Sequence, residues 1–229
     1  MNESIPAYSP SLIKEFESDI GVPDGFFSKI IHEDDWSFVV KLHGMIEAGL
    51  TQLILAHFGD TRLELPISKM NMNGASGKLA FVRALELLPP HNISFIQKLS
   101  EMRNTITHQI SNISFSIATH IQALDPQQLR NLVESCGDGI MPEISLLSTQ
   151  SYEERCVEQL KNEPRRLFWW SSVYVLGNIT KSKRWHSLKR KLAEMEREMG
   201  CMSRQLFAKT EAKPTENTEL ANTNPPDNV

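Results

Sequence analysis

The 229-residue sequence has few cysteines and no segment that alternates like a β-strand. Its three cysteines, Cys136, Cys156 and Cys201, are widely separated and lack the paired spacing of a metal site, which is typical of reduced thiols. The N-terminus lacks the basic and apolar run of a secretory signal peptide. We therefore expect an all-α protein located in the cytoplasm.

No apolar run is long enough to indicate a membrane protein. Residues 167–179 form the most apolar segment, but they fall short of the roughly 20 residues that cross a bilayer, and Ser171, Ser172 and Gly177 interrupt them. A hydrophobic content of 40% and a charged content of 23% are ordinary for a globular protein with a core. We expect no membrane partner.

The charge is unevenly distributed although the formal net charge is only -4. Residues 163–206 hold ten Lys or Arg against four Glu, and residues 181–191 hold six cations, no acid and a tryptophan. One interpretation is a surface that attracts RNA phosphates and stacks a base. An equally good one is the solvated face of a charged helix, with glutamates one turn further on. The predicted RNA-binding residues are Lys181, Lys183, Arg184, Trp185, Lys189, Arg190 and Lys191.

Helix signals predict an up-and-down helical bundle with extra C-terminal helices. Residues 1–30 are expected to form an accessory helix, 31–135 the helical core, 136–208 a helical extension and 209–229 a disordered tail. Within the extension, residues 152–162 and 165–180 are predicted to be helices, and the following charged segment has an apolar edge. That edge consists of Trp185, Leu188, Leu192, Met195 and Met199.

The first long helix of the core has clear end signals. Asp34 is a good N-cap and Gly59 a good helix stop, which predicts a helix between them. Glu47 falls on its apolar side, where we expect a histidine one turn away, His43, to satisfy the carboxylate. A loop is expected over residues 61–77, followed by a helix over residues 76–88 that Ser76 caps and two prolines end.

The central helix is predicted over residues 94–124. Ser94 and Gln97 have the spacing of a capping box at its start. Apolar residues then recur in steps of three and four, which predicts one continuous buried stripe. The stripe consists of Leu99, Met102, Ile106, Ile110, Ile113, Ile117, Ile121 and Leu124.

Arg103, Asn104 and His108 lie within this helix and suit metal-independent RNA cleavage. A histidine exchanges protons near neutral pH, and an arginine binds phosphate oxygens through two parallel hydrogen bonds. Asn104 either orients His108 or holds a phosphate oxygen. Helical arithmetic places Arg103 about 140° from His108, so one helix does not bring all three together. A second copy across a two-fold axis would complete the site.

The stretch EMRNTITHQI, with Arg103, Asn104 and His108 inside a helix of an all-α bundle, resembles the signature of the HEPN superfamily. The order of helices and loop over residues 34–124 is similar as well, notably to the MltR-like members. The resemblance implies a dimer of helical bundles and a ribonuclease that acts without metal or cofactor. It also implies toxin-antitoxin or phage-defence use, cleavage to 2',3'-cyclic phosphate and 5'-hydroxyl ends, and a possible antitoxin partner. Ile110 replaces the tyrosine that several HEPN toxins carry.

Two other functions stay open from the sequence. MltR-like relatives are described as regulators, so the chain is alternatively a regulator without catalysis. It is alternatively a helical interaction module that uses residues 168–175 as an adhesive surface. The remaining histidines show no ligand spacing with Asp, Glu or Cys, so we expect no metal.

Overall fold

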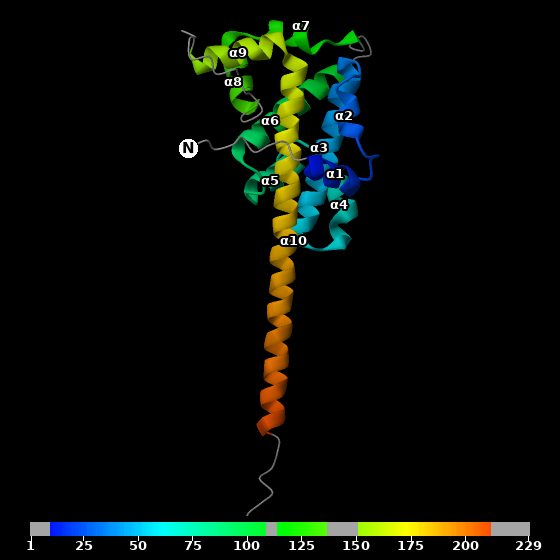
Figure 1. Ribbon diagram of the computed structural model, residues 1–229, viewed down its shortest axis with the longest axis vertical. Coiled ribbons are helices and arrows are strands. Elements are labelled where there is room, and N and C mark those ends of the chain that lie inside the picture. The colour runs from blue at the N-terminus through cyan, green and yellow to red at the C-terminus, as the bar shows by residue number, and fades with distance from the viewer. Residues whose placement is uncertain (1–9, 109–113, 137–150, 212–229) are drawn as a thin grey trace, which may run out of the picture. The chain divides into compact units, whose positions relative to one another are not determined.

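The structure is a computed structural model that describes residues 10–108, 114–136 and 151–211, with side chains described as far as residue 205. Within these residues it is an all-α helical bundle without strands, as the sequence predicts (Figure 1). The helices are α1 (Pro10–Asp19), α2 (Phe26–Ile30), α3 (Asp35–Phe58), the short 3-10 helix η1 (Thr61–Leu63), α4 (Glu64–Ser68), α5 (Lys78–Ala84), α6 (Pro90–Thr107), α7 (Ile117–Gln122), α8 (Pro126–Cys136), α9 (Tyr152–Asn162) and α10 (Pro164–Glu211).

The chain divides into two compact units, Met1–Ser187 and Leu188–Val229. The predicted boundary between core and extension, at residues 135 and 136, falls inside the first unit. The division instead falls within the long helix α10. The first unit therefore holds the described helices α1 to α9 together with the first part of α10.

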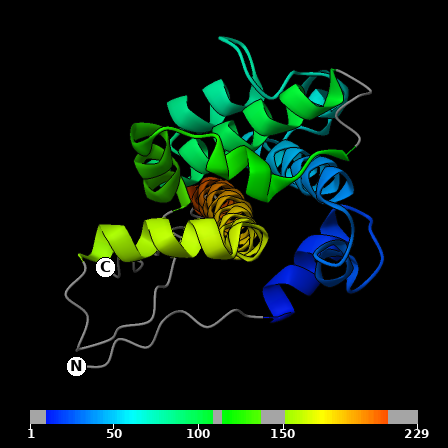
Figure 2. The same cartoon turned by 90° about the horizontal axis from the view of Figure 1, so that it is seen from above.

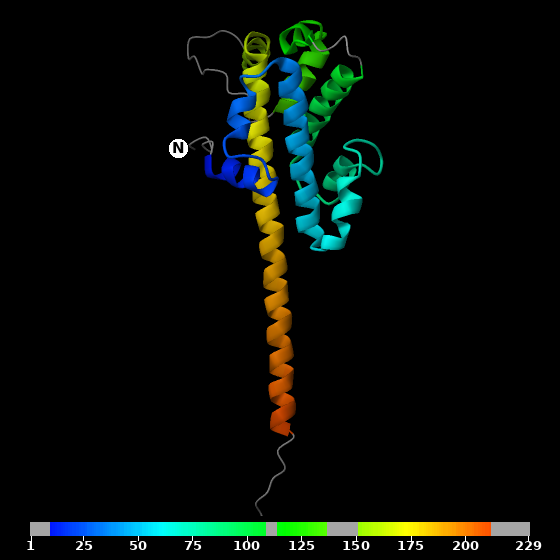
Figure 3. The same cartoon turned by 90° about the vertical axis from the view of Figure 1, so that its right-hand side faces the viewer.

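Helix α3 is the central element of the first unit, and its predicted ends are confirmed. The Asp34 side chain accepts a hydrogen bond from the Ser37 backbone N–H at 2.9 Å, and Gly59 ends the helix with a φ of 70°. By length and composition α3 would pass as a membrane span, but 61% of its most apolar window is buried inside the protein. Figure 3 shows it beside α6, against which it packs.

The prediction of one continuous helix over residues 94–124 is wrong. Helix α6 begins four residues earlier, with Pro90 in its first turn, so Ser94 lies inside the helix rather than at its cap. It ends at Thr107, and α7 starts separately at Ile117 with Ser116 as its N-cap. The apolar period continues across the break, which is why the pattern did not reveal it. Ile110 and Ile113 lie outside the described residues.

The region before α6 also differs from the prediction. The expected loop over residues 61–77 contains η1 and α4, and Gly77 rather than Ser76 stands at the start of α5. Helix α5 ends at Ala84 instead of Leu88, and Glu86 adopts a left-handed φ of 51°. A non-glycine residue in that conformation does not continue a right-handed helix.

The N-terminal helices pack against α3 and the first part of α10. Phe16 of α1 is buried, and Gly49 of α3 leaves room for it: a Cβ there would lie 2.6 Å from Phe16 Cε2 and 3.3 Å from Ile179 Cγ2. Trp169 Nε1 donates to the Phe27 carbonyl at 3.3 Å, and the two rings stack at 5.0 Å. Figure 2 shows α1 and α2, in dark blue, beside α3. The N-terminal accessory helix is thus part of the core.

The C-terminal helices follow the predicted starts. Helix α9 spans the predicted residues and begins with a complete capping box between Ser151 and Glu154. Pro164 opens α10, which continues without interruption through the charged segment. Phe168 and Val175 are buried in the core, so residues 168–175 do not form the predicted adhesive surface. The irregular segment expected at 137–150 lies outside the described residues, as does most of the predicted tail.

Candidate functional site

The predicted catalytic residues occupy the last turn of α6. Arg103 and Asn104 are half-buried, and Arg103 Nη1 donates a hydrogen bond to Asn104 Oδ1 at 3.1 Å. His108 is the C-cap residue; its backbone N–H donates to the Asn104 carbonyl at 3.3 Å and its side chain is exposed. The end of the helix therefore presents a guanidinium held by Asn104 and an exposed imidazole.

The geometry assigns Asn104 to Arg103 rather than to His108. Among the described residues, no side-chain hydrogen bond joins His108 to either of the other two, and no carboxylate pairs with Arg103. The hydrogen bond to the Asn104 amide restricts the orientation of the guanidinium and leaves its other N–H groups for a ligand. Within this chain no hydrogen bond between described side chains joins Arg103 to His108.

Residues at the start of α3 fix the end of α6. Trp36 Nε1 donates to the Ile106 carbonyl at 3.4 Å, which occupies an acceptor that the helix itself leaves open. Asp35 accepts from the Ile117 N–H at 2.8 Å and from Arg165 Nε at 2.7 Å. The Asp35 carboxylate therefore ties the start of α7 and the start of α10 to the start of α3, whose Trp36 holds the end of α6.

A partly buried polar network lies one turn before Arg103, and the sequence predicted only its contact between His43 and Glu47. Lys78 Nζ donates to Glu47 Oε1 at 2.8 Å, and Glu47 Oε2 lies 3.9 Å from His43 Nδ1. His43 Nε2 lies 3.3 Å from Ser100 Oγ, which accepts from Asn73 Nδ2 at 2.8 Å. The network joins α3, α5, α6 and the loop before α5, so it determines how these elements meet.

The network has a consistent hydrogen-bond direction. Because Asn73 donates to Ser100, the serine hydroxyl is free to donate to His43 Nε2, which leaves the proton on Nδ1, facing Glu47. Burial lowers the pKa of His43; Glu47 acts in the opposite direction, and the nearby charges of Arg103 and Lys78 lower it further. The motif arginine and the Lys78–Glu47 ion pair thus both act on the pKa of His43.

Glu47 and Lys78 also line a surface cavity of about 790 Å³ between α3 and α4. The expected partner of Glu47, His43, is nearby, but the close contact is with Lys78, whose side chain is only 1% exposed. One sequence signal pointed to this lysine: it lies four residues before the buried Val82, on the apolar face of α5. A lysine on that face requires a buried partner.

The basic stretch is already partly neutralised. Lys183 Nζ lies 2.5 Å from Asp19, and Arg184 forms an ion pair with Glu15, both on α1. Lys181 and Trp185 are exposed, and Trp185 is 62% accessible. In the second unit, the predicted residues Lys189 and Lys191 are exposed and Arg190 is half-buried. The structure thus leaves fewer cations available to RNA than the sequence suggested.

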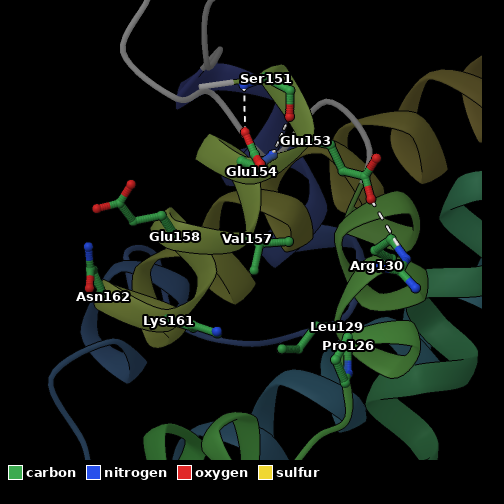
Figure 4. A pocket seen from close by; sticks show the side chains of 10 residues that line it. All are labelled: Pro126, Leu129, Arg130, Ser151, Glu153, Glu154, Val157, Glu158, Lys161 and Asn162. Carbon is green, nitrogen blue, oxygen red and sulfur yellow. Dashed lines mark hydrogen bonds and ion pairs between the residues drawn. The ribbon is translucent and has the colours of Figure 1, made fainter. Parts of the chain in front are cut away.

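A second cavity, of about 590 Å³, lies between α8 and α9 (Figure 4). Three of its charged residues have structural partners: Glu154 completes the α9 capping box with Ser151, and Glu153 lies 3.8 Å from Arg130 across the groove. Nothing in its lining resembles the chemistry of the α6 motif. Among the described residues, no group of three or more His, Cys, Asp or Glu is placed to hold a metal ion.

No protein-family model matches this chain, and neither a curated protein nor a solved structure matches it. The functional interpretation therefore rests on the residues and geometry of the α6 motif.

Proposed function

We propose that this protein is a metal-independent endoribonuclease of the HEPN type, with Arg103, Asn104 and His108 as its catalytic residues. The observation that carries the proposal is the end of α6, where Asn104 holds the Arg103 guanidinium and His108 is exposed one turn later. The motif residues and the order of long helices before them support it through their resemblance to HEPN proteins.

Each group has a distinct role in the proposed reaction. Cleavage removes a proton from the ribose 2'-hydroxyl, protonates the departing 5'-oxygen, and stabilises negative charge on the phosphoryl oxygens between them. Arg103 binds those oxygens with the N–H groups that Asn104 does not use. His108 transfers a proton. The products carry 2',3'-cyclic phosphate and 5'-hydroxyl ends.

The proposal includes a homodimer through the motif helix. A single His108 does not serve as base and acid at the same moment, whereas two copies related by a two-fold axis supply one histidine for each role. The Lys181 and Trp185 side chains, both exposed, are proposed to guide RNA toward the site. A partner protein of antitoxin type would restrain the activity.

The test is incubation of the protein with mixed cellular RNA and with tRNA in EDTA, followed by analysis of the fragment ends. His108→Ala is expected to abolish cleavage, and Arg103→Lys to reduce it strongly, because lysine keeps the charge but loses the planar pair of donors. His91→Ala is the matched control, since His91 lies in the first turn of α6, at the opposite end of the helix from His108.

Cyclic-phosphate fragments that persist in EDTA and disappear only in the His108 and Arg103 variants support the proposal. Intact RNA with the folded wild-type protein contradicts it and favours the non-catalytic regulator. Cleavage that survives in His108→Ala points to a contaminating nuclease. Circular dichroism of each variant confirms that the helices are retained.

A further inference from the structure

The second compact unit, Leu188–Val229, carries an apolar stripe along α10 that its own residues leave uncovered. The stripe, hereafter the α10 stripe, consists of Leu188, Leu192, Met195, Met199 and Met202, and each side chain is more than half exposed. Among the described side chains of residues 188–205, none is buried. A helix without tertiary packing is only marginally stable in water, so this stripe requires a partner.

The spacing of the stripe indicates what kind of partner fits. Its residues are separated by four, three, four and three positions, which is the a and d pattern of a heptad repeat. Such a 3.5-residue period keeps one seam facing a second helix in a left-handed coiled coil. In the sequence, Leu206 falls at the next position of the same pattern.

We propose that the α10 stripe pairs with the same stripe of a second copy of this chain, as an antiparallel two-helix coiled coil. Two-fold symmetry makes the contact isologous, so each position meets its counterpart about an axis between residues 193 and 194. Leu188 then faces the partner's Met199, and Leu192 faces the partner's Met195. In these layers a branched leucine packs against a flexible methionine, and in the outer layer Met202 faces the partner's Trp185.

The charges beside the stripe favour this orientation. Lys189 and Lys191 flank its first half, and Glu196 and Glu198 flank its second half, at the e and g positions of the heptads. Antiparallel pairing places the basic half of one helix against the acidic half of the other. Lys189 then meets the partner's Glu196 and Lys191 meets the partner's Glu198, and symmetry repeats both pairs.

A parallel pair is less complementary. It joins Lys191 to the partner's Glu196, but it sets Lys189 across from the partner's Arg184 and Glu198 across from the partner's Ser203. One favourable pair per side then competes with one repulsive pair. The distribution of charge along α10 therefore selects the antiparallel arrangement over the parallel one.

The proposal gives two residues of the basic stretch a new role. Lys189 and Lys191, which the sequence analysis assigns to RNA, become ion-pair partners between copies. The inference does not rest on ribonuclease activity. A disulfide between a Leu188→Cys chain and a Met199→Cys chain does not form in a dimer that pairs only through α6, so either proposal can fail while the other holds.

The first test is the mass of the full-length protein in solution, by sedimentation equilibrium over a range of concentrations. The wild type is expected to reach at least twice the 26.0 kDa chain mass, and more where the motif helices pair as well. Met195→Glu, which places a carboxylate in the seam, is expected to raise the dissociation constant of the dimer more than about tenfold. Cys201→Glu, the same side chain off the stripe, is the matched control and stays dimeric.

Charge variants test the flanking pairs without altering the stripe. Lys189→Glu with Lys191→Glu is expected to weaken the dimer, and adding Glu196→Lys with Glu198→Lys to the same chain is expected to restore it. Failure of restoration, with the helix intact by circular dichroism, contradicts the proposed pairing. A wild type that stays monomeric at about 100 μM, where a dissociation constant in the micromolar range gives mostly dimer, overturns this proposal and the motif-helix dimer together. An oligomer whose mass Met195→Glu does not lower overturns this proposal alone.

Orientation is tested by cross-linking in a Cys201→Ser background. A tagged Leu188→Cys chain and an untagged Met199→Cys chain are expected to form a disulfide with each other when mixed and oxidised, and little disulfide when each is oxidised alone. Efficient cross-linking of the Leu188→Cys chain to itself shows a parallel pair and overturns the antiparallel assignment.

Discussion

The Lys78–Glu47 ion pair predicts an asymmetric response to removing one partner at a time. The Lys78 side chain is 1% exposed, whereas the Glu47 side chain is 33% exposed and borders the cavity between α3 and α4. Glu47→Gln leaves a buried ammonium group with neutral acceptors only. Lys78→Met keeps the apolar stem and leaves a carboxylate that water can reach. Glu47→Gln is therefore expected to be less stable than Lys78→Met.

The magnitudes follow from the degree of burial. Breaking a fully buried ion pair costs about 3–5 kcal/mol, whereas an exposed pair is worth about 0–1 kcal/mol. We expect Glu47→Gln to lower the free energy of unfolding by about 3 kcal/mol, because its uncompensated charge is the buried one. For Lys78→Met we expect about 1 kcal/mol, since solvent screens the remaining carboxylate. The double variant, which leaves no uncompensated charge, is expected to lose less than Glu47→Gln alone.

The assay is urea unfolding at neutral pH, followed by tryptophan fluorescence. All four tryptophans lie in the first compact unit, so the signal reports on the unit that contains the ion pair. Lys41→Met is the matched control: it breaks the more exposed pair with Glu33 and is expected to cost under about 1 kcal/mol. Equal losses in the two single variants, or additive losses in the double variant, would refute the reasoning.

Three further predictions concern packing, pH and thiol reactivity. Gly49→Ala is expected to destabilise the protein by about 1–3 kcal/mol through overpacking, because its Cβ would lie 2.6 Å from the Phe16 ring. A Cβ at Gly44 in the same helix meets nothing within 4 Å, so Gly44→Ala is expected to raise the free energy of unfolding by about 0.5–1 kcal/mol. Thermal unfolding of both variants measures the two changes. The free energy of unfolding is expected to fall as the pH drops below 6.5. His43 then binds a proton in the unfolded chain but not in the folded one, where burial lowers its pKa. His43→Gln reduces this dependence in urea titrations and His32→Gln does not. A disulfide reagent is expected to find one reactive thiol in the native protein, the exposed Cys201, and three after denaturation, because burial raises the pKa of both other cysteines.

The sequence alone determined the features that depend on local chemistry. Asp34 and Gly59 mark the ends of α3 because a side-chain cap and a left-handed glycine act within one turn of the helix. The start of α9 and the role of Pro164 followed in the same way. The α6 motif residues were also identified from the sequence, since their types and spacing suggest a chemistry before any fold is known.

Only the tertiary structure decided where the central helix ends. The apolar period runs past Thr107 without a change, but the ends of α6 and α7 are held by Trp36 and Asp35, about 70 and 82 residues away in the sequence. Likewise, the sequence shows Lys78 only as a residue on the apolar face of α5, whereas the structure shows it paired with Glu47 of α3. Periodicity and caps report on neighbours along the chain, whereas buried polar partners come from other elements, and their pairing appears only when those elements pack.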